Sequence, residues 1–185
     1  PLDQQQHRIS KLGDDCYHVF LDVGANMGVH SRFLMEPDSY PKAKTARGHF
    51  DSIYGTQRDN RDFCMFAFEP NPAHKQRHEA FRQAYEQMGW RYHYIGAGVG
   101  DQDGDLTFYH MDLNKHNEWG FSTVKEKCKL ECRPEIVPVI RLAAWIDEHI
   151  HQRKLPEVVH GSLKEGGPKV GTQFSIRLCS LRDAC

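Results

Sequence analysis

An acidic residue, an asparagine and two glycines end the first strongly apolar run of the chain, as Asp22, Gly24, Asn26 and Gly28. Glycine adopts backbone angles that other residues avoid and leaves room for a ligand beside the main chain. A helix expected at residues 29–36 turns its free N–H groups toward the same place. The pattern predicts a loop that binds a nucleotide-like ligand, although a tight turn before a helix would have the same glycines.

A second apolar run, at residues 64–68, is followed by Glu69, Asn71 and Pro72. An acid at the carboxyl end of the second strand of a doubly wound sheet lies where a ribose presents its hydroxyls, so Glu69 is a predicted ribose ligand. The alternative is a solvated acid near a helix N-terminus. Asn71 and Pro72 favour the start of a helix over residues 72–88. The predicted core stripe of that helix is Phe81, Ala84, Tyr85 and Met88.

A glycine-rich segment follows a third predicted strand at residues 91–95 and contains Ala97, Gly98 and Asp101. Close approach of the backbone to adenine is one interpretation, with Asp101 accepting from the exocyclic amine. The other is the tight turn of a hairpin at residues 101–105, leading into an alternating strand. Both interpretations stay open.

The glycine spacing distinguishes between two nucleotide cofactors. Asp-x-Gly-x-x-x-Gly differs from the Gly-x-Gly-x-x-Gly fingerprint of dinucleotide sites and fits S-adenosylmethionine better than NAD. A dinucleotide site also places its acid about 20 residues after the glycines, whereas Glu69 lies much further from Gly28. An NAD-dependent oxidoreductase is therefore the weaker alternative.

These blocks together resemble the FkbM-type family of S-adenosylmethionine-dependent methyltransferases over roughly residues 17–150. The motifs that carry the resemblance are Asp22–Gly28, Phe68–Pro72, Gly100–Tyr109, Ser122–Val124 and the strand and helix at Val137–Ile150. The resemblance implies an α/β fold: a Rossmann-like, doubly wound, mostly parallel sheet with helices on both faces. It also implies methylation of a small-molecule or sugar hydroxyl.

The resemblance assigns roles to individual residues. Asp22 approaches the methionine amine or orders the loop, and Glu69 holds the ribose. Asp101 meets the adenine edge, while Ser122 and Thr123 are candidate substrate contacts, although polar residues there usually only cap turns. The full set of predicted cofactor-binding residues is Asp22, Gly24, Ala25, Asn26, Gly28, Glu69, Asn71, Ala97, Gly98 and Asp101.

The family's acidic Lys-x-Asp-x-Glu-Gly strand has no counterpart, because no Asp or Glu lies between Lys169 and Arg182. Residues 174–178 alternate well enough for a short strand without those acids. The sheet is thus expected to be incomplete at the C-terminus, in a fragment or an alternative product with a divergent tail. A catalytically inactive protein that binds the cofactor is therefore a rival interpretation, and no catalytic residue is assigned.

Three segments are expected: an arm at 1–15, the cofactor-binding domain at 16–150, and a linker and tail at 151–185. The polar insertion at 37–62 is predicted to be a solvated surface loop, with a lid or substrate loop as the alternative. A net charge of −1, from 24 basic and 25 acidic residues, argues against nucleic acid as a partner. The partner that the resemblance implies is a small-molecule acceptor. No apolar run approaches the ~18 residues of a membrane span.

The cysteines and histidines suggest no special chemistry. Six cysteines are too few and too scattered for a disulfide scaffold, which favours a reducing compartment such as the cytoplasm. Cys128 and Cys132, with His110 and His116 upstream, raise a zinc hypothesis, but their spacing argues against it, so no metal is expected. The twelve histidines are predicted to be surface residues.

Overall fold

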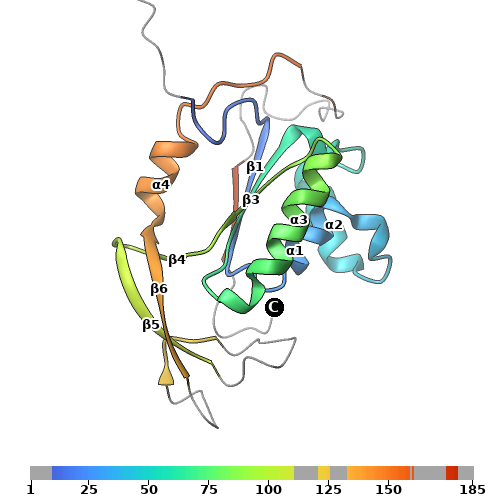
Figure 1. Cartoon of the computed structure of the whole chain (residues 1–185). Coiled ribbons are helices and arrows are strands. Elements are labelled where there is room, and N and C mark those ends of the chain that lie inside the picture. The colour runs from blue at the N-terminus through green and yellow to red at the C-terminus, as the bar shows by residue number, and fades with distance from the viewer. Residues whose placement is uncertain (1–9, 111–120, 126–132, 159, 161–173, 179–185) are drawn as a thin grey trace, which may run out of the picture.

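The computed structural model describes residues 10–110, 121–125, 133–158, 160 and 174–178. Within these ranges the protein is a mixed α/β fold, with a parallel sheet, a smaller second sheet and surrounding helices (Figure 1). The parallel sheet has the strand order β3-β2-β1-β7. Its strands are β1 (His18–Val23), β2 (Phe63–Phe68), β3 (Arg91–Ile95) and β7 (Phe174–Leu178).

The two apolar runs of the sequence form the centre of this sheet. Strand β2 is buried at every position, and Leu21 of β1 pairs with Phe66 of β2 in parallel register. Parallel strands covered on both faces need such continuous apolar sequences. Strand β7 pairs with the other side of β1, so the short strand predicted at residues 174–178 is confirmed.

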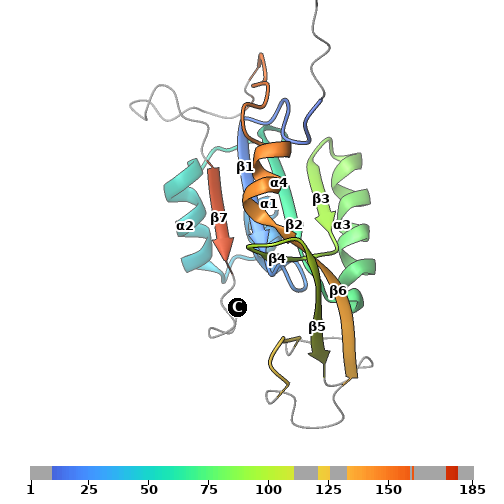
Figure 2. The same ribbon diagram turned by 90° about the vertical axis from the view of Figure 1, so that its left-hand side faces the viewer.

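Helices cover both faces of the sheet (Figure 2). On one face, Phe20 and Met65 pack with the helices α1 (Val29–Met35), α2 (Lys44–Tyr54) and α3 (Lys75–Gln87). On the other, Leu21 and Phe66 pack against α4 (Leu142–His149) through residues such as Trp145. Successive strand residues point to opposite faces, so β1 and β2 contribute to both cores.

The insertion at residues 37–62 is not a solvated loop, so that prediction was wrong. It contains α2 between two short 3-10 turns, η1 (Pro37–Ser39) and η2 (Asn60–Asp62). Helix α2 buries Phe50 against Phe20 and Tyr54 against Phe63, with ring centroids 5.6 and 4.9 Å apart. These two aromatic residues stand one helical turn apart and form an apolar face that the surrounding charged residues obscure in the sequence.

The helix predicted at residues 72–88 forms as the 3-10 turn η3 (Pro72–His74) followed by α3, but its buried stripe differs from the prediction. Tyr85 is buried and Phe81 partly buried, whereas Ala84 and Met88 are exposed. His78 takes the remaining core position and is fully buried. The 3- and 4-residue spacing from 78 to 81 to 85 puts these side chains on one face.

The second sheet contains β4 (Gly98–Gly100), β5 (Gly104–His110) and β6 (Arg133–Arg141) in the order β4-β6-β5. The predicted hairpin between β4 and β5 is therefore wrong, because β6 lies between them, parallel to β4 and antiparallel to β5. An added Cβ at Gly100 would lie 2.9 Å from Val139 of β6. The glycines of β4 thus accommodate a neighbouring strand.

The segment before β1 is hydrogen-bonded to the end of α4 and to the residues that follow it. Residues 10–15 form turns in which the Gly13 N–H donates to the His149 carbonyl (2.9 Å) and the Lys154 N–H donates to Asp14 (2.6 Å). Most of the predicted linker and tail lies outside the described residues, as does most of the predicted arm. No helix in the described ranges is both long and apolar enough to cross a bilayer.

A disulfide joins Cys16, just before β1, to Cys64 in β2, with Cα atoms 5.5 Å apart. Both residues are fully buried. The disulfide was not predicted from the sequence, which favoured a reducing compartment. Disulfides persist mainly in oxidising compartments. Cys128, Cys132, Cys179 and Cys185 lie outside the described residues, so this disulfide accounts for all the described cysteines.

Candidate functional site

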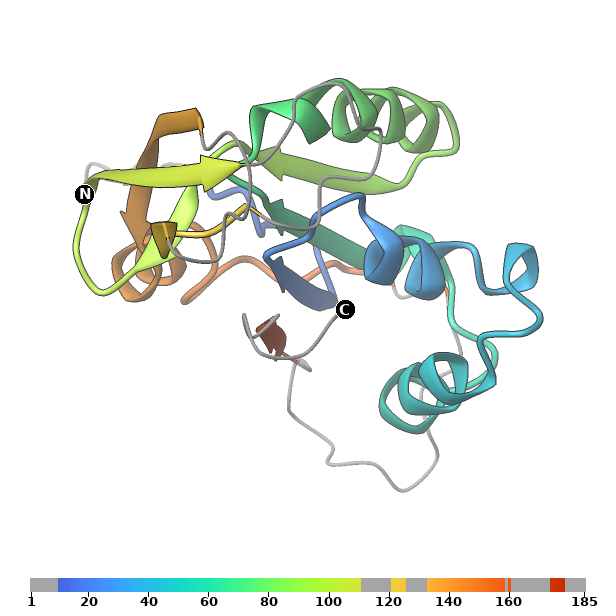
Figure 3. The same cartoon turned by 90° about the horizontal axis from the view of Figure 1, so that it is seen from below.

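The loop after β1 has the backbone that its sequence predicted. Gly24, Asn26 and Gly28 have φ angles of 74°, 50° and 74°, in the left-handed region. The N–H groups of Gly24 and Ala25 both donate to the carbonyl of Phe68, at 2.9 and 3.0 Å. The loop therefore bends over the carboxyl end of β2 before α1 begins. Figure 3 shows the molecule from the side on which these strands end.

Asp22 is fully buried beneath this loop. Its carboxylate accepts a hydrogen bond from the Ser31 hydroxyl (2.8 Å), and His30 Nδ1 lies 3.9 Å away. Both partners belong to the first turn of α1. Of the two predicted roles for Asp22, the geometry favours ordering the loop and the helix that follows it.

Glu69 lies directly beside the loop. One carboxylate oxygen accepts from the Asn26 N–H (2.6 Å) and the other accepts from the Asn71 N–H (2.8 Å). The residue is only 5% exposed. The glycine loop and this acid, each predicted to contact a nucleotide-like ligand, are thus joined by a hydrogen bond.

Burial raises the pKa of Glu69 to about 7. The two backbone N–H donors oppose this effect because they stabilise the charged carboxylate, and the nearby charge of Asp22 adds to it. A carboxylate has about four lone-pair positions, of which two are used here. Glu69 therefore keeps acceptor capacity for a further donor.

Asn71 starts the following helix. Its side-chain oxygen accepts from the Ala73 N–H (3.0 Å), and the residue is 1% exposed. This is the capping role predicted for Asn71 from its sequence.

The residues predicted to meet adenine lie along the start of the second sheet. Ala97 is buried, and a Cβ added at Gly98 would lie 3.3 Å from Val139. The close backbone approach predicted here is thus made by β6. Asp101 is exposed in the turn after β4, the yellow-green turn at the left of Figure 1.

The predicted substrate residues lie beside the far end of β5. Ser122 forms an antiparallel bridge with Tyr109, and its hydroxyl accepts from the Val124 N–H (3.1 Å). Ser122 is buried and Thr123 exposed. The Ser122 hydroxyl therefore caps a turn, as in the alternative considered for it.

Sequence reasoning missed one residue of this site, His78 on α3. Its Nε2 lies 2.6 Å from the carbonyl oxygen of Asn26, inside the glycine loop. The expectation of surface histidines was wrong for four of them, since His30, His74, His78 and His110 are buried. The available signal was the spacing of His78 from Phe81 and Tyr85, which belongs to a core-facing helical stripe.

No group of three or more metal-ligating side chains occurs among the described residues. His110 is buried, with Nε2 3.9 Å from Glu135. The other members of the zinc hypothesis, His116, Cys128 and Cys132, lie outside the described residues.

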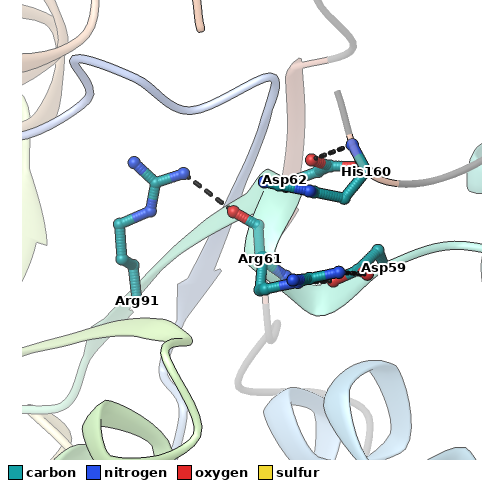
Figure 4. Close-up of polar contacts among 5 residues, drawn as sticks. All are labelled: Asp59, Arg61, Asp62, Arg91 and His160. Carbon is teal, nitrogen blue, oxygen red and sulfur yellow. Dashed lines mark hydrogen bonds and ion pairs between the residues drawn. The ribbon is translucent and has the colours of Figure 1, made fainter. Parts of the chain in front are cut away.

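A second polar cluster lies at the opposite edge of the sheet, where the strands begin (Figure 4). The backbone N–H of His160 donates to both carboxylate oxygens of Asp62, at 2.8 and 3.0 Å. Arg91 donates to the carbonyl of Arg61 (2.9 Å), and Arg61 pairs with Asp59 at 2.6 Å. These contacts link the turn before β2 to His160 and to Arg91, the first residue of β3.

Comparison of the chain with models of protein families, with curated proteins and with solved structures finds no match. Function must therefore be argued from the site itself.

Proposed function

We propose that the chain binds S-adenosyl-L-methionine and is an FkbM-type methyltransferase that methylates a hydroxyl of a small molecule or sugar. The observation that carries the proposal is the 2.6 Å hydrogen bond between the Asn26 N–H and Glu69. It joins a left-handed glycine loop and a buried acid at the carboxyl ends of two adjacent parallel strands.

A Rossmann-like, doubly wound sheet is the finer description that we propose for the fold. Strands β2 and β3 lie on one side of β1, and β7 lies on the other. The strand order therefore reverses direction at β1. In open α/β sheets, ligands bind outside the carboxyl ends of the strands at such a switch point. The loop after β1 lies at that position, which supports a nucleotide ligand there.

The free acceptor capacity of Glu69 fits a ribose. Each of its oxygens accepts one backbone N–H, which leaves about two lone-pair positions for two neighbouring hydroxyls. The loop residues Gly24–Gly28 would line the methionine and ribose, and Asp22 would order the loop through Ser31. When bound, S-adenosylmethionine supplies a methyl group on a positively charged sulfur.

The assignment of adenine to Ala97, Gly98 and Asp101 has less support than the ribose assignment. Val139 fills the space beside Gly98, and Asp101 is exposed on the second sheet. We keep these three residues as a prediction, to be tested separately from Glu69.

A second candidate function is cofactor binding without methyl transfer. Strand β7 occupies the place beside β1, and its sequence, Phe-Ser-Ile-Arg-Leu, has no carboxylate. Arg177 stands in register with Asp22, at a strand where the resembling family carries acids. Alignment of the acceptor for in-line attack would lack those acids, which favours a binding protein.

Calorimetric titration with S-adenosylmethionine, S-adenosylhomocysteine and NAD tests the proposal. We expect the first two to bind and NAD not to bind. Binding of NAD alone would favour an oxidoreductase and contradict the proposal. Binding of both adenosyl ligands, with no turnover on hydroxylated acceptors, would select the second candidate.

The variant Glu69→Ala tests the ribose contact directly. We expect it to weaken both adenosyl ligands by about 1.5–3 kcal/mol, the scale of hydrogen bonds to a charged group. The matched control is Glu148→Ala, which removes a carboxylate from the exposed side of α4. Equal affinities for the two variants would remove Glu69 from the site.

A further inference from the structure

His78 is a fully buried histidine with polar partners on both ring nitrogens. Nδ1 lies 2.6 Å from the Tyr92 hydroxyl, and Nε2 lies 2.6 Å from the Asn26 carbonyl oxygen. One side chain thus links α3 and β3 to the middle of the glycine loop.

The partners determine where the ring proton lies. A carbonyl oxygen only accepts hydrogen bonds, so Nε2 carries the proton and donates it to Asn26. Nδ1 is then an acceptor, and the Tyr92 hydroxyl donates to it. Burial lowers the pKa of His78 to about 4, so the ring is neutral at pH 7 with this single tautomer.

The peptide groups of Asn26 are held on both sides. The Asn26 N–H donates to Glu69 (2.6 Å) and its carbonyl accepts from His78 (2.6 Å). Asn26 has φ 50°, a left-handed conformation that asparagine adopts more readily than most other non-glycine residues. Such a conformation persists where the surroundings hold it, and here His78 and Glu69 do so.

The orientation of the His78 ring is set by aromatic neighbours. It stacks on Tyr94 with ring centroids 4.8 Å apart and an angle of 3° between the planes. The Tyr94 hydroxyl in turn donates to the backbone carbonyl of Glu69 (3.1 Å). His78 and Glu69 are therefore both held by tyrosines of β3: Tyr92 and Tyr94 contact His78, and Tyr94 also contacts Glu69.

We infer that His78 is a positioning residue that fixes the Asn26 peptide and, through it, the direction in which Glu69 faces the ligand. The ligand part of this inference rests on the proposed adenosyl function. The part that concerns the loop geometry does not rest on that function, because the loop geometry is measured without any ligand.

Two substitutions separate hydrogen bonding from packing. His78→Phe keeps a ring that stacks on Tyr94 but removes both hydrogen bonds. His78→Gln keeps one N–H donor and one oxygen acceptor about as far apart as the ring nitrogens. The control Tyr85→Phe, on the same helix face, removes the hydroxyl that donates to Glu36 and leaves the loop contacts in place.

Without ligand, the readouts are hydrogen exchange of the Asn26 amide and the ¹⁵N shifts of the His78 ring. We expect protonated Nε2 and unprotonated Nδ1 in the wild type. We expect faster Asn26 exchange in His78→Phe, recovery in His78→Gln, and no change in Tyr85→Phe. A proton on Nδ1, or unchanged exchange in His78→Phe, would overturn the inference.

With S-adenosylhomocysteine, we expect His78→Phe to bind about tenfold or more weakly, the equivalent of one or two buried hydrogen bonds, and His78→Gln to recover most of the loss. Unchanged affinity in His78→Phe would overturn the positioning of Glu69. If the wild type binds no adenosyl ligand, the proposed function fails, while the exchange and ¹⁵N data still decide the role of His78 in the loop.

Discussion

The two edges of the parallel sheet hold their carboxylates in different ways. At the amino edge, Asp59 pairs with Arg61, and this hydrogen bond lowers the pKa of Asp59 to about 2 (Figure 4). At the carboxyl edge, Glu69 is held by backbone N–H groups, and burial raises its pKa to about 7. The two acids differ in solvation and in partner, which moves their pKa values in opposite directions.

This difference shows what each edge is suited to do. At the amino edge, the acids form an ion pair and accept hydrogen bonds from the backbone, and these contacts attach the strands to neighbouring segments. At the carboxyl edge, left-handed loop residues and a buried acid with spare acceptor positions have the features of the ligand site that we propose. Residues of the amino edge should therefore affect stability alone, and those of the carboxyl edge should also affect binding.

The largest expected effect comes from Gly28→Ala. Its φ is 74°, and an added Cβ would lie 2.8 Å from a ring carbon of Phe81. Backbone strain and overpacking together should lower the free energy of unfolding by about 3 kcal/mol. Urea denaturation measures this loss, and binding should weaken as well.

Gly89→Ala is the matched control for this variant. Gly89 has φ 73°, but nothing lies within 4 Å of an added Cβ. Gly89→Ala should therefore show the effect of backbone strain alone, a loss of about 1 kcal/mol in the free energy of unfolding. Equal losses at the two glycines would mean that contact with Phe81 does not constrain the loop.

An intermediate effect is expected for the pH dependence of stability. The folded-state pKa of His78, about 4, lies below the unfolded value of 6.5, so the unfolded chain binds more protons between these pH values. This contribution to stability is complete above about pH 6.5 and is lost as the pH falls toward 4. His78→Gln should reduce the fall in unfolding free energy across this window by about 2 kcal/mol.

The control for this pH profile is His151→Gln, at a side chain that is 63% exposed. Its profile should follow that of the wild type. If His78→Gln and the wild type fall in parallel between pH 6.5 and pH 4, the burial of a neutral His78 ring is not the cause.

The smallest effect should come from Asp62→Ala at the amino edge. It removes the acceptor for the His160 N–H and should lower the unfolding free energy by about 1 kcal/mol. The affinity for S-adenosylhomocysteine should stay the same, in contrast to Glu69→Ala. A loss of affinity in Asp62→Ala would show that the two edges are coupled and would end the division between them.

Local patterns were enough to predict the central elements. The apolar runs predicted β1 and β2, and the residue types after them predicted the left-handed loop and the acid beside it. These features depend on neighbours in the chain, namely strand burial and the backbone freedom of glycine. The helix η3–α3 and its Asn71 cap were predictable for the same reason.

Other features depend on residues far apart in the chain. The insertion of β6 between β4 and β5 was not visible in the short segment around Asp101, because the strand that separates them comes later in the sequence. Helix α2 was missed because its core-facing residues, Phe50, Ile53 and Tyr54, stand among polar and charged residues. The disulfide of Cys16 and Cys64 required the parallel register that brings β1 and β2 together.

The amino-acid sequence by itself determined that a glycine loop and an acid would each follow a buried strand. The tertiary structure alone decided that His78, from a helix, holds the carbonyl of Asn26 while Glu69 holds its N–H. The physical reason is that glycine angles and strand burial are local properties, whereas a hydrogen bond between a helix and a loop exists only after the elements have packed.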